Sequence, residues 1–142
     1  MERKLTAQPG RGAFAALARS SVVHVAFAFL AMGGWAVFSN RAAGTGHALT
    51  AGLVQGALSG AITLGLKRFL EAASARLAGV WAMVLPPATS CAVILVLLVG
   101  AHLLAGTRHI WATISVPYAV SSTYAWVYAL MMVRERAVAA TT

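Results

Sequence analysis

Long apolar stretches alternate with short polar connections along this chain. A helix needs about 20 residues to cross the hydrocarbon core of a bilayer. Stretches of this kind cover residues 21–38, 47–66, 80–105 and 110–133. The pattern predicts an all-α fold, an integral membrane four-helix bundle that forms a single membrane domain over residues 1–142.

The second apolar stretch has one face made only of small or polar residues. These residues recur at the spacing of one helix face and are Gly52, Gln55, Gly56, Ser59, Gly60 and Thr63. Acyl chains are as apolar as leucine, and small residues let helix backbones approach closely, so within lipid this face is expected to point into the bundle. We expect the stripe to face the fourth span. We also expect the glycines to join helices of one chain, with association of two copies as the alternative.

The connection between the second and third spans carries its own periodicity. Apolar residues recur at helical spacing after Leu66, while basic residues lie mostly on the other side. This pattern is typical of a short amphipathic interfacial helix between spans two and three. The prolines Pro86 and Pro87 then leave two choices: the third span begins at Pro86, or it begins near Val80 and bends at the prolines. We favour the start near Val80.

Composition supports the membrane interpretation. Of 142 residues, 60% are hydrophobic and only 10% are charged, which does not suffice to cover a soluble globule with polar side chains. Basic residues favour one set of connections and are Arg3, Lys4, Arg11, Arg19, Lys67, Arg68, Arg76, Arg134 and Arg136, against Arg41 and Arg108 in the alternate connections. This asymmetry predicts both termini in the cytoplasm, in a bacterial-type inner membrane. Because the charges are scattered over span ends, the net charge of +8 does not indicate nucleic-acid binding.

Gln55 lies near the middle of the second span, where its amide must find hydrogen-bond partners. By depth, we expect those partners to be Ser121 and Ser122 on the fourth span. Such a contact either fixes helix packing or lines a transport pathway.

A second group of residues flanks the predicted outer connections and consists of Arg41, His47, His102, Arg108 and His109. Arginine binds phosphate or carboxylate in a bidentate manner, and histidine adds donors that depend on pH. We therefore expect either an anionic headgroup site, for example for a lipid carrier, or simple anchoring at the interface. The spacing of the histidines does not fit a metal site, and no cofactor is expected.

The acidic residues Glu2, Glu71 and Glu135 all lie outside the predicted spans, which disfavours proton antiport through a buried carboxylate. No familiar hydrolase, kinase or acyl-transfer motif is present. We expect a non-enzymatic permease, flippase or accessory protein with membrane lipids and an amphipathic or lipid-linked substrate as partners. The alternatives are an assembly subunit of a larger complex or homodimer and, third, a lipid-modifying enzyme that uses the outer arginine and histidine residues.

In span number, size and cytoplasmic termini, the layout is similar to that of the small GtrA-like proteins, which are associated with moving polyprenyl-phosphate-linked sugars. This resemblance covers most of the length and implies a translocation role. At the end of span two, however, Leu64, Gly65, Leu66, Lys67 and Arg68 replace the aromatic-and-asparagine signature expected for that group.

Overall fold

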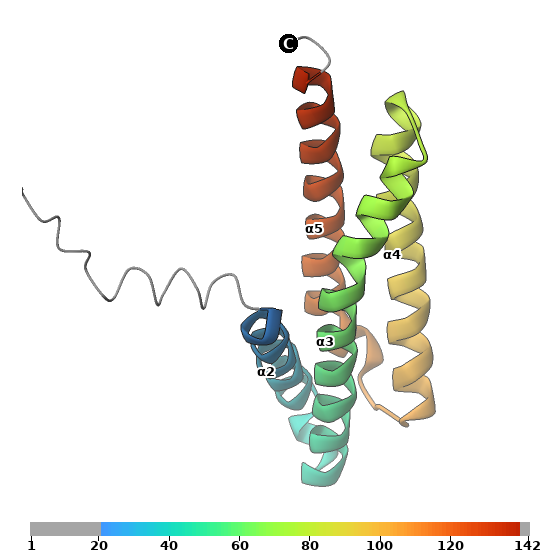
Figure 1. Ribbon diagram of the computed structural model, residues 1–142. Helices are drawn as coiled ribbons and strands as arrows, with labels where there is room; N and C mark the ends of the chain where they lie inside the picture. Colours follow the sequence, from blue (N-terminus) through green and yellow to red (C-terminus); the bar gives the residue numbers. More distant parts are fainter. Residues whose placement is uncertain (1–20, 140–142) are drawn as a thin grey trace, which may run out of the picture.

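The computed structural model describes residues 21–139, and its regular elements there are all helical (Figure 1). They are α2 (Ser21–Ser39), the short 3-10 helix η1 (Arg41–Ala43), α3 (Thr45–Ala75), α4 (Gly79–Leu104) and α5 (Ile110–Ala139). The all-α prediction is confirmed for this part of the chain, and one long helix corresponds to each of the four predicted stretches. The basic residues before the first span, Arg3 to Arg19, lie outside the described residues.

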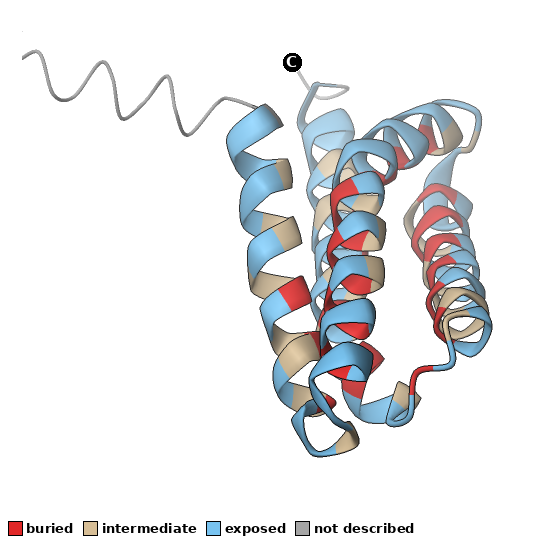
Figure 2. Cartoon of the chain, turned by 90° about the horizontal axis from the view of Figure 1, so that it is seen from below, coloured by how far each residue is buried: buried red, intermediate tan, exposed pale blue. Residues whose placement is uncertain are grey.

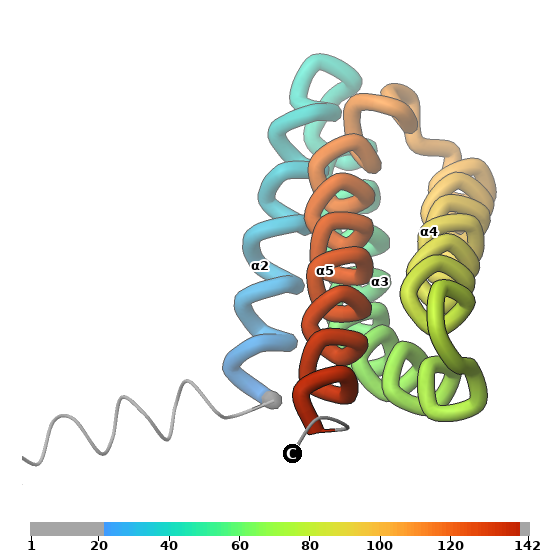
Figure 3. The backbone as a smooth tube through the Cα atoms, turned by 90° about the horizontal axis from the view of Figure 1, so that it is seen from above, coloured from blue at the N-terminus to red at the C-terminus, as the bar shows by residue number. Residues whose placement is uncertain are grey.

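The four long helices pack as a bundle in which α3 and α5 form the centre. Both central helices contact α2 on one side and α4 on the other, and α2 has no contact with α4. Figure 3 shows this order from above, with α2 and α4 at opposite edges. We call the end that holds the connections 40–44 and 105–109 the two-loop end, and the opposite end, where α3 passes into α4, the one-loop end.

Within the described residues, α2, α3 and α4 are long and apolar enough to cross a membrane. These three helices support the membrane interpretation by length and composition. Helix α5, with 30 residues, is not one of these candidate spans, and its sequence contains the three consecutive hydroxyl residues Ser121, Ser122 and Thr123. A fourth span at 110–133 therefore stays a prediction.

The separate amphipathic helix predicted between spans two and three is wrong. Helix α3 continues without a break to Ala75, and only residues 76–78 separate it from α4. The reason is that Leu66, Leu70 and Ser74, spaced at i+4, extend one buried face of α3 beyond the predicted span. Figures 1 and 3 show this last part of α3 leaning toward the start of α4.

The prolines of the third span lie inside the helix. Helix α4 begins at Gly79, which confirms a start near Val80, and Pro86 and Pro87 are both buried within it. The Ser90 hydroxyl donates to the Pro86 carbonyl at 2.9 Å. The buried face of α4 thus includes both prolines and extends from Ala82 to His102.

The small and polar face of α3 is turned inward, as predicted. Gln55 is fully buried and Ser59 is 6% exposed, whereas Leu53 on the opposite face is 64% exposed. Figure 2 shows the buried positions of α3 on its inward side. Thr63, which belongs to the stripe by spacing, is exposed, so that part of the prediction is wrong.

The glycines of the stripe contact α2. A Cβ atom added at Gly33 would lie 2.8 Å from the Gly52 carbonyl oxygen, and one added at Gly56 would lie 2.9 Å from the Phe29 carbonyl oxygen. These glycines therefore lie where α2 and α3 of one chain pack against each other. The expectation that they face the fourth span is wrong, because α2, which precedes α3 and is joined to it by a short turn, covers this face.

Candidate functional site

A chain of buried polar side chains joins α3, α4 and the loop before α5 near the two-loop end. His102 Nε2 lies 3.0 Å from Gln55 Oε1, and His102 Nδ1 lies 2.8 Å from Thr107 Oγ1. Gln55 Nε2 donates to Ser59 Oγ at 2.9 Å. Gln55 and His102 are fully buried, and Thr107 is 9% exposed. The chain therefore runs from the helix interior almost to the surface.

The bonding pattern assigns the protons of this network. Because the Gln55 amide nitrogen donates to Ser59, the Gln55 oxygen is the acceptor toward His102. His102 then carries its proton on Nε2, and its Nδ1 accepts from the Thr107 hydroxyl. Every polar atom of the His102 ring is thereby paired.

The loop that holds Thr107 is built by a tight turn at the end of α4. Gly106 adopts a positive φ of 65°, a conformation that favours glycine. The Thr107 amide donates to the His102 carbonyl at 3.0 Å. Backbone and side chain of Thr107 therefore both bond to His102, which fixes the position of the hydroxyl.

A second buried network at the same end ties α2 to α5. The side-chain nitrogen Nδ2 of Asn40 donates to the Ala36 carbonyl at 2.9 Å and to Thr113 Oγ1 at 2.6 Å. The His109 amide donates to Asn40 Oδ1 at 3.2 Å. Nearby, Trp35 Nε1 donates to the Ala112 carbonyl at 2.9 Å.

Sequence reasoning paired Gln55 with the wrong partners. Ser121 and Ser122 are half-buried, and no hydrogen-bond partner of Ser122 Oγ is found in the described part of the chain. Gln55 bonds instead to Ser59 on its own helix and to His102 on α4. Depth in the membrane did not reveal which neighbouring helix each side chain faces.

The outer group of cations is divided by the structure. Arg41, His47, Arg108 and His109 are exposed, whereas His102 is fully buried. His102 therefore does not lie on the surface with the others, because it bonds to Gln55 and Thr107 inside the bundle. The headgroup site stays a prediction for the four exposed residues.

Arg41 already has contacts within the chain. Its Nη1 donates to the Phe38 carbonyl at 2.8 Å, and its guanidinium carbon lies 4.0 Å from the centre of the Phe38 ring. A cation over an aromatic face is attracted by the ring quadrupole. This geometry fits anchoring at an interface as well as headgroup binding.

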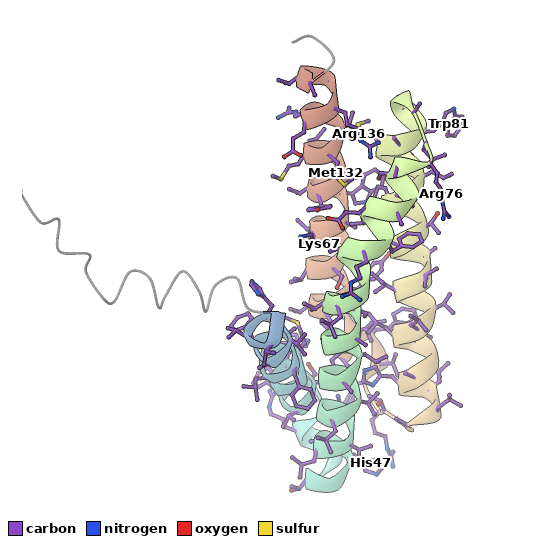
Figure 4. The ribbon with its side chains drawn as sticks, in the orientation of Figure 1. His47, Lys67, Arg76, Trp81, Met132 and Arg136 are labelled. Carbon is purple, nitrogen blue, oxygen red and sulfur yellow. The ribbon has the colours of Figure 1, made fainter. Side chains whose placement is uncertain are left out.

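The one-loop end carries a different set of polar contacts. Tyr128 donates to Glu71 at 2.7 Å, and Lys67 Nζ lies 3.9 Å from the same Glu71 oxygen. Arg136 donates to the Ser74 carbonyl at 2.8 Å. Figure 4 places Lys67, Arg76 and Arg136 away from His47, which lies at the two-loop end. The bonds of Tyr128 and Arg136 join α3 to α5, while the ion pair of Lys67 and Glu71 lies within α3.

The residues that sequence reasoning missed are Thr107 and Thr113. Both lie in or just after a connection, where threonine is common, so composition gave no signal. Within residues 21–139, no group of three or more His, Cys, Asp or Glu side chains is placed to hold a metal ion. Comparison with protein families, curated proteins and solved structures gives no match to this chain.

Proposed function

We propose that this chain is a small multi-pass membrane protein of permease or flippase type, which moves or presents an amphipathic, lipid-like molecule. Two features support this proposal: apolar side chains face outward while small and polar ones face inward, and the inward set includes a histidine. A histidine within a membrane helix is a functional candidate by default, because burying an ionisable group in lipid is costly.

The contact between Gln55 and His102 is the observation that carries the proposal. Both side chains are fully buried between helices that are otherwise packed through apolar and small residues. A buried amide or imidazole without a partner costs several kcal/mol, in the range of about 2–7 kcal/mol by transfer measurements. Exchange of one Gln55 or His102 bond for a bond to a passing polar headgroup would keep that cost low.

The test is lipid movement in vesicles that contain the purified full chain. Quenching of an NBD-labelled phosphatidylethanolamine by dithionite reports exchange between leaflets. We expect faster exchange than in protein-free vesicles, and we expect Gln55→Leu and His102→Leu to slow it. The matched control is Thr63→Val, which removes an exposed hydroxyl from the same helix. The proposal would be contradicted if the wild type exchanged lipid no faster than protein-free vesicles, or if Gln55→Leu exchanged lipid at the wild-type rate.

A second role, as an assembly subunit of a larger membrane complex, is favoured by one observation. The polar atoms of the His102 ring already have partners within the chain, so the network is complete without a ligand. Val22, Phe27 and Leu30 on α2 are 75%, 71% and 71% exposed, which suits a neighbouring helix as well as lipid. Purification in mild detergent separates the two roles: a stoichiometric large partner supports the subunit, and an isolated chain or homodimer supports the carrier.

We also propose that both termini lie in the cytoplasm, in a bacterial-type inner membrane. The one-loop end holds most basic residues of the described part, namely Lys67, Arg68, Arg76, Arg134 and Arg136, and such residues favour the cytoplasmic side. Single cysteines replacing His47 and Arg68 in a Cys91→Ser background test this orientation. A membrane-impermeant thiol reagent applied to intact cells should label position 47 and leave position 68 unlabelled; the reverse pattern would overturn the assignment.

A further inference from the structure

Helices α2 and α3 separate toward the one-loop end. A Cβ atom added at Gly56 would lie 2.9 Å from the Phe29 carbonyl oxygen, whereas one added at Gly60 would lie 3.2 Å from the Val25 side chain and 4.0 Å from the Val25 carbonyl oxygen. One turn later, Thr63 lies on the same face of α3 and is exposed. Figure 3 shows the two helices converging toward their shared turn at the far end. The contact between the helix backbones is therefore tight near the turn and becomes looser toward the start of α2.

This separation leaves an open apolar groove between the two helices. The groove has a volume of about 540 Å³ and is lined by Val22, Val25, Ala26, Phe29, Leu30 and Leu64. All lining residues are apolar, and α2 supplies all of them except Leu64. The shape and chemistry of the groove suit a hydrocarbon chain.

Basic side chains lie at the end of the groove. Lys67 and Arg68 follow Leu64 by about one helical turn, and both are exposed. Lys67 follows Gly60 by about two turns, so it extends from the face of α3 that contacts α2. Lys67 Nζ is 3.9 Å from Glu71 Oε1, a distance that leaves its donors available to an additional acceptor. Figure 4 shows Lys67 on this part of α3.

We propose that the groove binds one acyl chain of an anionic phospholipid whose phosphate contacts Lys67 and Arg68. Charge complementarity favours this occupant over a zwitterionic lipid or a second copy of the chain. Basic residues outnumber acidic ones among the described residues at this end. Besides the rim residues Lys67 and Arg68, the basic residues are Arg76, Arg134 and Arg136, and the acidic residues are Glu71 and Glu135. Basic pockets between membrane helices on the cytoplasmic side bind anionic headgroups in this way. The site lies away from the Gln55 and His102 network, and its occupation does not depend on lipid movement.

Native mass spectrometry of the full chain in mild detergent tests the charge requirement. The protein is mixed with equal amounts of phosphatidylglycerol and phosphatidylcholine that carry the same acyl chains. We expect preferential retention of phosphatidylglycerol, and a loss of about fivefold in that preference for each of Lys67→Gln and Arg68→Gln. The control Arg76→Gln removes the same charge beside the start of α4, away from α2, and should change the preference far less. Equal retention of both lipids by the wild type, or an equal loss in Arg76→Gln, would overturn the proposal.

A second pair of variants tests the groove itself. Ala26→Trp places a large ring in the groove and should lower the retention of both lipids, while Ala57→Trp adds the same ring to the outward face of α3 and should not. Lipid retention in folded Ala26→Trp at the wild-type level would refute the site. The rim variants change only exposed side chains, so the charge test still decides if Ala26→Trp does not fold.

Discussion

Replacing both members of the Gln55 and His102 pair should be less harmful than the two single replacements suggest. His102→Leu leaves the Gln55 oxygen, which is fully buried, without its donor. Gln55→Leu likewise leaves His102 Nε2 without its acceptor. Each orphaned buried group lowers the free energy of unfolding by about 1–3 kcal/mol. In the double variant, both partners are apolar and of similar volume, so this penalty is absent from the contact between α3 and α4.

The expected coupling in a double-mutant cycle is therefore about 0.5–2 kcal/mol, with the double variant more stable than the sum of the single losses predicts. Reversible unfolding in mixed micelles, followed by circular dichroism, measures the four free energies. The bond between the Thr107 hydroxyl and His102 Nδ1 is lost equally in His102→Leu and in the double variant, so its loss cancels in the cycle. Additive losses would show that the two side chains do not bond in the folded protein.

Three further predictions, tested with four variants, concern the contacts between helices. Gly56→Val should lower the free energy of unfolding by about 1–3 kcal/mol, because the added side chain meets the α2 backbone. Gly34→Ala has open space around the added Cβ and should change the free energy of unfolding by less than about 1 kcal/mol. Equal losses for the two variants in thermal melts would contradict the close packing at Gly56. Asn40→Ala removes the donor to Thr113 Oγ1 and the acceptor of the His109 amide and should cost about 1–3 kcal/mol. An unchanged melting temperature would exclude these bonds. Tyr128→Phe removes a bond to a half-exposed carboxylate and should cost less than about 1 kcal/mol; a larger loss would mean that this contact is more buried than described.

The helices and the inward face of α3 were predictable because they follow from periodicity. A period of about 3.6 residues fixes which side chains share a face, and Gly52, Gln55, Gly56 and Ser59 share one whatever the neighbours are. The solvent then decides its direction: in lipid, small and polar residues turn toward other helices. Those two arguments need no knowledge of the remaining chain.

The identity of the neighbouring helix was not predictable in the same way. The spacing of the stripe does not state whether α2, α4 or α5 covers it, and the structure divides it, with the glycines against α2 and Gln55 against His102 of α4. From the sequence, His102 was predicted to lie at the interface with the other cations, because it lies close to the end of its helix. Its burial depends on the loop through Thr107, which folds back over it, and such a loop leaves no periodic signal.

The most direct test of the central claim is to measure whether each face of α3 contacts lipid, water or protein in a bilayer. Spin labels on Leu53→Cys and Ser59→Cys, each in a Cys91→Ser background, report collisions with oxygen, which concentrates in lipid, and with a water-soluble nickel complex. Leu53 is 64% exposed and Ser59 is 6% exposed. We predict strong collision with oxygen and weak collision with nickel at position 53, and little of either at position 59. Strong oxygen contact at position 59, or nickel contact at position 53, would contradict an account in which lipid surrounds the apolar face and the small, polar face packs inside.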